Sequence, residues 1–177
     1  MMDSYGIEEL AHLKYHLMIC GGCESLNLKY AILLGRFGRR AMASIGFTGT
    51  QQGMTEEQKK SLRALLDGGA GELHHGDCIG ADAEAHDIAD ECGYAIILHP
   101  PTNYSKRAWR EVPRHMARPE KAYLDRNKDI VLETAALIAA PAEPEEQLRS
   151  GTWSTVRFAK KQGKPVFVIL PDGTVKR

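Results

Sequence analysis

From residue 44 onward, short apolar runs alternate with longer stretches in which apolar residues recur at helical spacing. The apolar runs predict five strands, at residues 44–47, 72–75, 94–99, 135–140 and 165–170. The run at 94–99 lacks polar alternation, which indicates a strand buried on both faces. Strands that alternate with helices are typical of a parallel sheet covered by helices. The sequence therefore predicts an α/β fold, a Rossmann-like, doubly wound, mostly parallel five-stranded sheet with helices on both faces.

The stretches between the strands predict four helices, at residues 55–67, 81–91, 122–133 and 152–162. Thr55 precedes Glu-Glu-Gln-Lys-Lys, which supplies a helix cap and an acidic first turn. Leu62, Leu65 and Leu66 form the expected buried stripe of that helix. The segment 102–119 is polar, proline-containing and long for a connection, so we expect it to cover a binding site.

Residues 1–41 lack this alternation and differ from the rest of the chain. Met42 is followed at once by Ala-Ser-Ile-Gly-Phe-Thr-Gly-Thr, which resembles the opening strand of a domain. Two explanations stay open: a misassigned start, or an accessory helix whose apolar face is formed by Ile7, Leu10, Leu13 and Leu17. The predicted organisation is an N-terminal extension over 1–41 and one domain over 42–177.

Charge and apolar content narrow the expected partners. Lys+Arg and Asp+Glu are both 23, so no overall field steers the chain toward nucleic acid or an anionic membrane. The apolar run at residues 31–34 is far shorter than the roughly 20 residues of a membrane helix. We therefore expect a cytoplasmic protein with a small-molecule partner. The sequence leaves the oligomeric state open, including a homo-oligomer.

Cysteine and histidine spacing gives no metal-binding pattern. Cys20 and Cys23 have the two-residue gap of zinc and redox sites, but no second pair follows at ligand spacing. His74 and His75 are neighbours in a predicted strand and so point to opposite faces, which makes it difficult for both to join His86 around one ion. The sequence predicts no metal site and no cofactor.

Three glycine-containing loops each follow a predicted strand and precede a helix. Such loops present backbone N–H groups at the carboxyl edge of a parallel sheet, where phosphates bind. Arg126 is the expected clamp for a phosphate or carboxylate. The predicted ligand-binding residues are Thr48, Gly49, Thr50, Gly76, Asp77, Gly80, Asp82, Arg126, Gly151, Thr152 and Thr155. Together they predict a site for a phosphate-bearing, nucleotide-derived small molecule.

The same loops carry a family resemblance over residues 44–170. Gly-Phe-Thr-Gly-Thr, His-Gly-Asp-Cys-Ile-Gly-Ala-Asp-Ala-Glu-Ala-His and Ser-Gly-Thr-Trp-Ser-Thr resemble the SLOG superfamily, which includes DprA, the LOG phosphoribohydrolases and YpsA-like proteins. The matching positions are Gly76, Gly80, Asp82, His86 and the Gly151-Thr152 pair. The resemblance implies a Rossmann-like domain that binds nucleotides, nucleotide sugars or related signals and, in some members, cleaves an N-glycosidic bond.

The chain departs from the LOG pattern at the residues of the catalytic motif. Those enzymes have Pro-Gly-Gly before Gly-Thr and a glutamate three residues after the threonine, whereas Arg149-Ser150 and Thr155 stand here. A threonine cannot replace a carboxylate that stabilises an oxocarbenium-like centre. Asp77 and Asp82 are the candidate catalytic carboxylates, and the acidic run 143–146 is another source.

Three functions therefore remain open after the sequence is read. The first is a sensor or sequestering domain for the nucleotide derivative, and the second is an N-glycosidase or phosphoribohydrolase acting on nucleoside phosphates. The third is DNA binding in the manner of DprA, suggested by the basic segment 106–118 and opposed by the neutral net charge.

Overall fold

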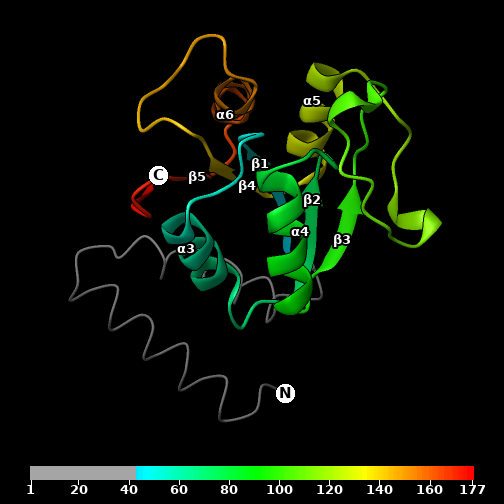
Figure 1. The fold of residues 1–177 in the computed structure, drawn as a ribbon, viewed down its shortest axis with the longest axis horizontal. Helices are drawn as coiled ribbons and strands as arrows, with labels where there is room; N and C mark the ends of the chain where they lie inside the picture. Colours follow the sequence, from blue (N-terminus) through cyan, green and yellow to red (C-terminus); the bar gives the residue numbers. More distant parts are fainter. Residues whose placement is uncertain (1–42) are drawn as a thin grey trace.

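A computed structural model of the chain describes residues 43–177, in which one six-stranded sheet lies between two pairs of helices (Figure 1). The spatial order is β3-β2-β1-β4-β5-β6. The strands are β1 (Ala43–Gly49), β2 (Gly71–His75), β3 (Ala95–Leu98), β4 (Ala136–Ala140), β5 (Val166–Ile169) and β6 (Val175–Lys176). All neighbours pair in parallel except β5 and β6. The predicted α/β, doubly wound, mostly parallel architecture is confirmed.

The number of strands is where the prediction falls short. β6 adds a sixth strand, which pairs antiparallel with β5 through Ile169 and Val175. A tight turn joins them, in which the Gly173 amide donates to the Leu170 carbonyl at 2.8 Å and Gly173 has a φ of +84°. A strand of two residues is too short to show any hydrophobic period, so the sequence gives no signal for it.

Each face of the sheet carries one pair of helices. The helices are α3 (Glu56–Leu66), α4 (Ala81–Glu91), α5 (Tyr123–Glu133) and α6 (Gly151–Lys161). The first two cover one face and the last two cover the other. The predicted cap of α3 is present: the Thr55 hydroxyl accepts from the Gln58 amide at 3.1 Å, and the Gln58 side chain accepts from the Thr55 amide at 3.0 Å.

Apolar side chains on both faces form the core. On the α3 and α4 face, Leu62, Leu65 and Leu66 are buried as predicted and pack with Phe47. On the opposite face a separate cluster includes Trp153 of α6. Both faces of β4 are therefore covered, which explains the uninterrupted apolar sequence of this central strand.

The strand order reverses direction between β1 and β4, which positions the site. The chain leaves β1 toward α3 on one face and leaves β4 toward α6 on the other. Loops that diverge in this way leave a crevice at the carboxyl edge of the sheet, where ligands of doubly wound folds bind. The Thr50 amide donates to the Ala140 carbonyl at 3.0 Å, so the two loops separate directly beyond this bond.

The 102–119 segment lies beside β3 and the start of α4 and contains two short 3-10 helices, η1 (Tyr104–Lys106) and η2 (Arg114–Met116). The Arg118 amide donates to the Leu98 carbonyl at 2.8 Å, which fixes the end of the segment to β3. Within residues 43–177 no helix has the length and apolar character needed to cross a membrane. The predicted extension over 1–41, with Cys20 and Cys23, lies outside the described residues.

Candidate functional site

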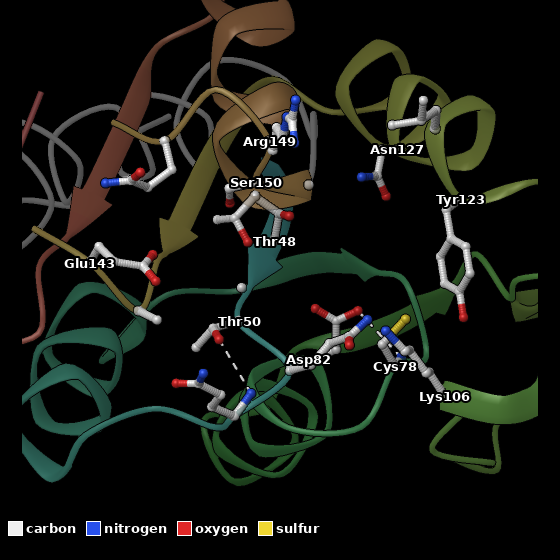
Figure 2. Close-up of a pocket in the computed structure, with 18 of the residues that line it drawn as sticks. Thr48, Thr50, Cys78, Asp82, Lys106, Tyr123, Asn127, Glu143, Arg149 and Ser150 are labelled. Atoms are coloured by element: carbon white, nitrogen blue, oxygen red, sulfur yellow. Dashed lines mark hydrogen bonds between the residues drawn. The ribbon is translucent and has the colours of Figure 1, made fainter. Parts of the chain in front are cut away.

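A cavity of about 990 Å³ opens at the carboxyl edge of the sheet, where β1 and β4 part (Figure 2). Its wall comes from five parts of the chain: the end of β1, the loop that leads into α4, η1, the start of α5, and the segment that leads from β4 into α6. Figure 2 shows Thr48, Thr50, Glu143 and Arg149 around the same space. The crevice predicted from strand topology is thus a pocket large enough for a nucleotide-sized ligand.

The N-terminus of α6 supplies unpaired donors to this pocket. The hydroxyl of Ser150 caps the helix by accepting from the Trp153 amide at 3.3 Å. The amides of Gly151 and Thr152, which both line the pocket, have no acceptor among residues 43–177. A Cβ built on Gly151 would meet no atom within 4 Å. This helix end is therefore open to an incoming acceptor, and its dipole favours an anion.

Two cations from different segments face the same pocket. Arg149 stands directly before the α6 cap, and Lys106 reaches the opposite side from η1 (Figure 2). Neither side chain has a hydrogen-bond or ion-pair partner in the described part of the chain. Both are available to a phosphate. The sequence prediction did not include them, because lone basic residues in loops carry no periodic or motif signal.

The end of β1 contributes hydroxyl groups and a close packing contact. Thr48 is buried and Thr50 accepts from the Gln52 amide at 3.2 Å. A Cβ on Gly49 would lie 2.4 Å from the Cβ of Ala81. Gly49 therefore allows α4 to approach β1 closely, which is the packing role of a glycine in a strand-to-helix turn.

The loop between β2 and α4 directs most of its backbone amides at acceptors within the protein. One oxygen of Asp82 accepts from the amides of Gly76 at 3.0 Å and Cys78 at 3.4 Å. The same oxygen lies 3.7 Å from Nη1 of Arg126, whose Nη2 donates to Sγ of Cys78 at 2.9 Å. Burial raises the pKa of Asp82, and the nearby Arg126 opposes that rise. Burial also raises the pKa of Cys78 to about 11, which keeps it a thiol.

The glycines of this loop accommodate protein groups. A Cβ on Gly76 would lie 1.0 Å from Nη1 of Arg126, so the guanidinium occupies the space that a side chain would need. Gly80 has a φ of +82°, and a Cβ there would lie 2.4 Å from the Gln51 carbonyl oxygen. Neither glycine is part of the pocket wall. Their structural purpose is to let Arg126 and the β1 loop pack against the chain.

Asp77 anchors the 102–119 segment. Its buried carboxylate accepts from Nε of Arg107 at 2.6 Å through one oxygen and from the Arg110 amide at 2.9 Å through the other. The backbone supports this arrangement, because Asp77 has a φ of +51° and its carbonyl accepts from the Ala108 amide at 2.8 Å. Asp77 is not part of the pocket wall, so the structure gives it a positioning role.

The predicted site residues thus divide into two groups. The pocket wall includes Thr48, Gly49, Thr50, Asp82, Arg126, Gly151 and Thr152. Gly76, Asp77, Gly80 and Thr155 lie behind it. Thr155 donates to the Gly151 carbonyl at 2.9 Å and accepts from the Asn127 side chain at 2.8 Å, and Asn127 does reach the pocket. Thr155 therefore orients a wall residue that sequence reasoning missed.

Two histidine pairs lie on opposite faces of the sheet, as predicted for His74 and His75; three of the four side chains are buried and His86 is half-buried. His74 contacts His99, with Nδ1 and Nε2 3.0 Å apart, and His75 contacts His86 at the same distance. Burial lowers the pKa of all four imidazoles, and it brings that of His99 to about 3. None of the four lines the pocket.

Comparison of the chain with known protein families and with curated proteins gave no match. The assignment of the pocket therefore rests on its own geometry and on the motifs of the three loops.

Proposed function

We propose that this protein binds a phosphate-bearing, nucleotide-derived small molecule in the pocket between β1 and β4, as a sensor or sequestering domain. The observation that carries the proposal is the open N-terminus of α6. There the free amides of Gly151 and Thr152 and the unpaired Arg149 face one space. Backbone N–H groups, a helix dipole and a guanidinium together favour a dianionic phosphate over a neutral ligand.

The rest of the wall suits the other parts of a nucleotide. Tyr123 presents an aromatic ring on which a base can stack, and Asn127 offers an amide that can both donate and accept. The hydroxyls of Thr48 and Thr50 suit a ribose or a second phosphate. The resemblance to the SLOG superfamily supports the same ligand class.

Native mass spectrometry of gently purified protein, followed by calorimetry with a panel of nucleoside mono- and diphosphates and dinucleotides, tests the proposal. Arg149→Gln should weaken binding of the best nucleotide at least about tenfold, the usual loss for a charge-assisted hydrogen bond. Lys160→Gln is the matched control, because Lys160 is an exposed cation on the same helix and does not line the pocket. Equal affinities for the parent and Arg149→Gln, or no nucleotide binding at all, would overturn the proposal.

Hydrolysis of the N-glycosidic bond is the second candidate, and Glu143 favours it. Its carboxylate lines the pocket and has no hydrogen-bond or ion-pair partner among residues 43–177, whereas Asp82 faces Arg126. A free carboxylate can stabilise positive charge on the sugar or orient a water. Chromatographic detection of released base, abolished by Glu143→Gln, would support an enzyme. Binding without release would support the sensor.

DNA binding gains less support from the arrangement of the basic segment. Arg107 pairs with Asp77, Arg110 with Asp87 and Arg118 with Glu133. Guanidinium groups held by carboxylates are less available to a phosphate backbone. Steeply salt-dependent binding to single-stranded DNA would be needed to favour this function.

A further inference from the structure

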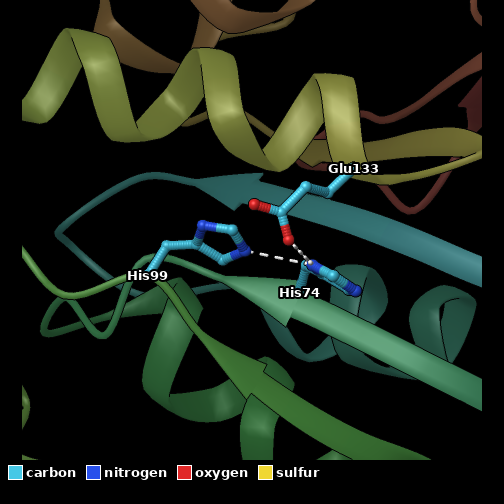
Figure 3. A group of neighbouring side chains, drawn as sticks. All are labelled: His74, His99 and Glu133. Atoms are coloured by element: carbon cyan, nitrogen blue, oxygen red, sulfur yellow. Dashed lines mark hydrogen bonds and ion pairs between the residues drawn. The ribbon is translucent and has the colours of Figure 1, made fainter. Parts of the chain in front are cut away.

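His74, His99 and Glu133 gather at the β2 and β3 side of the sheet, outside the pocket (Figure 3). His74 belongs to β2, His99 directly follows β3, and Glu133 is the last residue of α5. Nδ1 of His74 lies 3.0 Å from Nε2 of His99 and 3.9 Å from a carboxylate oxygen of Glu133. The three donor atoms all lie within 4.8 Å of one another. Three segments distant in sequence thus bring three candidate ligand atoms close together.

A neighbouring carboxylate orients the first imidazole. Oε2 of Glu72 lies 3.4 Å from Nε2 of His74, on the side of the ring that faces away from the cluster. A proton held on Nε2 leaves the lone pair of Nδ1 directed at His99 and Glu133. The same carboxylate-to-histidine contact orients metal-binding histidines in proteins.

We propose that His74 Nδ1, His99 Nε2 and the Glu133 carboxylate bind a divalent late first-row transition cation of the Zn²⁺ type. Two imidazole nitrogens and one carboxylate oxygen match the preference of such ions, with a fourth position left for water. Zn–N bonds of about 2.0–2.1 Å place tetrahedral ligand atoms about 3.3 Å apart. The 3.0 Å and 3.9 Å separations need only small side-chain shifts to meet that geometry.

Charge and access at the cluster are also compatible with a cation. The two histidines are buried, while the Glu133 side chain is 36% exposed and leaves a path from solvent. Arg118 faces the cluster and donates to Oε2 of Glu133 at 2.8 Å, so it fixes the carboxylate and adds one positive charge. The oxygen that accepts from Arg118 is the same Oε2 that lies 3.9 Å from Nδ1 of His74, so a bound cation would share it with Arg118 or use the other oxygen of Glu133. The carboxylates of Glu72 and Glu133 together carry more charge than Arg118.

The pair of His75 and His86 resembles the pair of His74 and His99 but lacks a third candidate ligand. His75 and His86 have the same 3.0 Å contact and the same 5.2 Å ring separation as His74 and His99. No third metal-binding side chain of the described residues completes that pair. His86 is therefore a control for a histidine that pairs with a buried histidine but has no third metal-binding side chain beside it.

Calorimetric titration of the tag-free full-length chain with Zn²⁺, in a Cys20→Ser/Cys23→Ser background, tests the proposal. We expect one ion per chain. Glu133→Gln removes a donor and the ion pair with Arg118, whereas Arg118→Gln removes the ion pair alone. Glu133→Gln should therefore weaken Zn²⁺ affinity at least about tenfold, while Arg118→Gln should keep or strengthen it.

The remaining outcomes are equally decisive. His86→Gln should bind Zn²⁺ like the parent, and Co²⁺ in place of Zn²⁺ should give the absorption spectrum of a four-coordinate site without thiolate ligands. Absence of stoichiometric Zn²⁺ binding, an unchanged affinity in Glu133→Gln, or an equal loss in His86→Gln would overturn the proposal. Nucleotide binding by Glu133→Gln should match the parent, which separates this site from the pocket.

Discussion

The β2–α4 loop and the β4–α6 loop share a pattern in sequence and differ in how their polar groups are used. Both follow a parallel strand, contain glycine and lead into a helix. In the first, Asp82 accepts the Gly76 and Cys78 amides, and Arg126 fills the space beside Gly76. In the second, the Gly151 and Thr152 amides have no acceptor among residues 43–177, and no atom lies within 4 Å of a Cβ built on Gly151.

This difference shows that a glycine in such a loop has two physical uses. One is to admit a protein side chain, as Gly76 admits the guanidinium of Arg126. The other is to leave backbone donors exposed to a ligand, as at Gly151. A motif shows that the chain turns, whereas only the three-dimensional contacts show which groups already have partners. The predictions below test the contrast between the closed β2–α4 loop and the open β4–α6 loop.

Gly76→Val should produce the largest change. A side chain at this position must displace Arg126 from Asp82 and leave a buried charge without its partner, which typically costs about 3 to 5 kcal/mol of the free energy of unfolding. Gly151→Val has no such clash and should stay within about 0.5 kcal/mol of the parent. Urea denaturation of both variants measures the contrast, and equal stabilities would contradict it.

Asp82→Asn should have the next largest effect. The substitution keeps the shape of the side chain but removes its negative charge. That charge faces Arg126 and strengthens the hydrogen bonds that the Asp82 oxygen accepts from the Gly76 and Cys78 amides. We therefore expect a loss of about 2 to 3 kcal/mol in the free energy of unfolding. Asp87→Asn is the control, because its ion pair with Arg110 is exposed and should contribute less than about 1 kcal/mol. A smaller loss for Asp82→Asn than for Asp87→Asn would mean that the closed loop is not held by this network.

Gly151→Val should act on binding in the open loop. A branched side chain there enters the pocket rather than the core, so nucleotide affinity should fall at least about tenfold, or about 1.4 kcal/mol, with no change in unfolding. Gly151→Ala should fall between Gly151→Val and the parent. Calorimetry and circular dichroism on the same samples separate the two effects, and undiminished affinity in Gly151→Val would remove the α6 N-terminus from the site.

Mild acid should weaken the closed loop through His75, which accepts from the Asp77 amide at 3.2 Å. Burial holds the pKa of His75 well below 6.5 in the folded chain, so below pH 6.5 the unfolded chain binds the extra proton. Stability contributed by this group is therefore lost as pH falls from 6.5 toward the lowered folded pKa. The loss approaches about 1.4 kcal/mol per pH unit for each such histidine.

The open loop contains no histidine over residues 141–155, so this acid effect should not arise there. Urea denaturation at pH 7.0, 6.0 and 5.0 should show a shallower loss of stability in His75→Gln than in the parent. Parallel pH profiles for the two proteins would show that His75 titrates alike in the folded and unfolded chains.

The fold was largely predictable from the sequence, because its elements are long enough to show a period. Leu62, Leu65 and Leu66 recur at helical spacing, and Thr55 carries the cap chemistry of α3. β6 could not be predicted in this way, because a strand of two residues cannot show a hydrophobic period. The coarse position of the site follows from the same logic, because loops after parallel strands meet at one edge.

The details of the site depend on contacts between distant residues. Arg149 and Asn127 reach the pocket through loop and helix placement that no local pattern encodes, whereas Glu143 belongs to the acidic run that the sequence already indicated as a source of a carboxylate. The pairing of His74 with His99 likewise depends on the register of β2 and β3, in which His74 lies opposite Ile97 and His75 opposite Leu98. Sequence spacing alone gives neither the register nor the approach of Glu133 from α5.

The contact between Gly76 and Arg126 also bears on how this sequence can diverge. Because a Cβ at position 76 and the guanidinium of Arg126 would occupy the same volume, position 76 cannot gain a side chain while Arg126 keeps its place. Among homologous chains, we expect an arginine at the position of Arg126 only where glycine stands at the position of Gly76, and a smaller residue where it does not. A correlation between the residues at these two positions would identify a closed β2–α4 loop from aligned sequences alone.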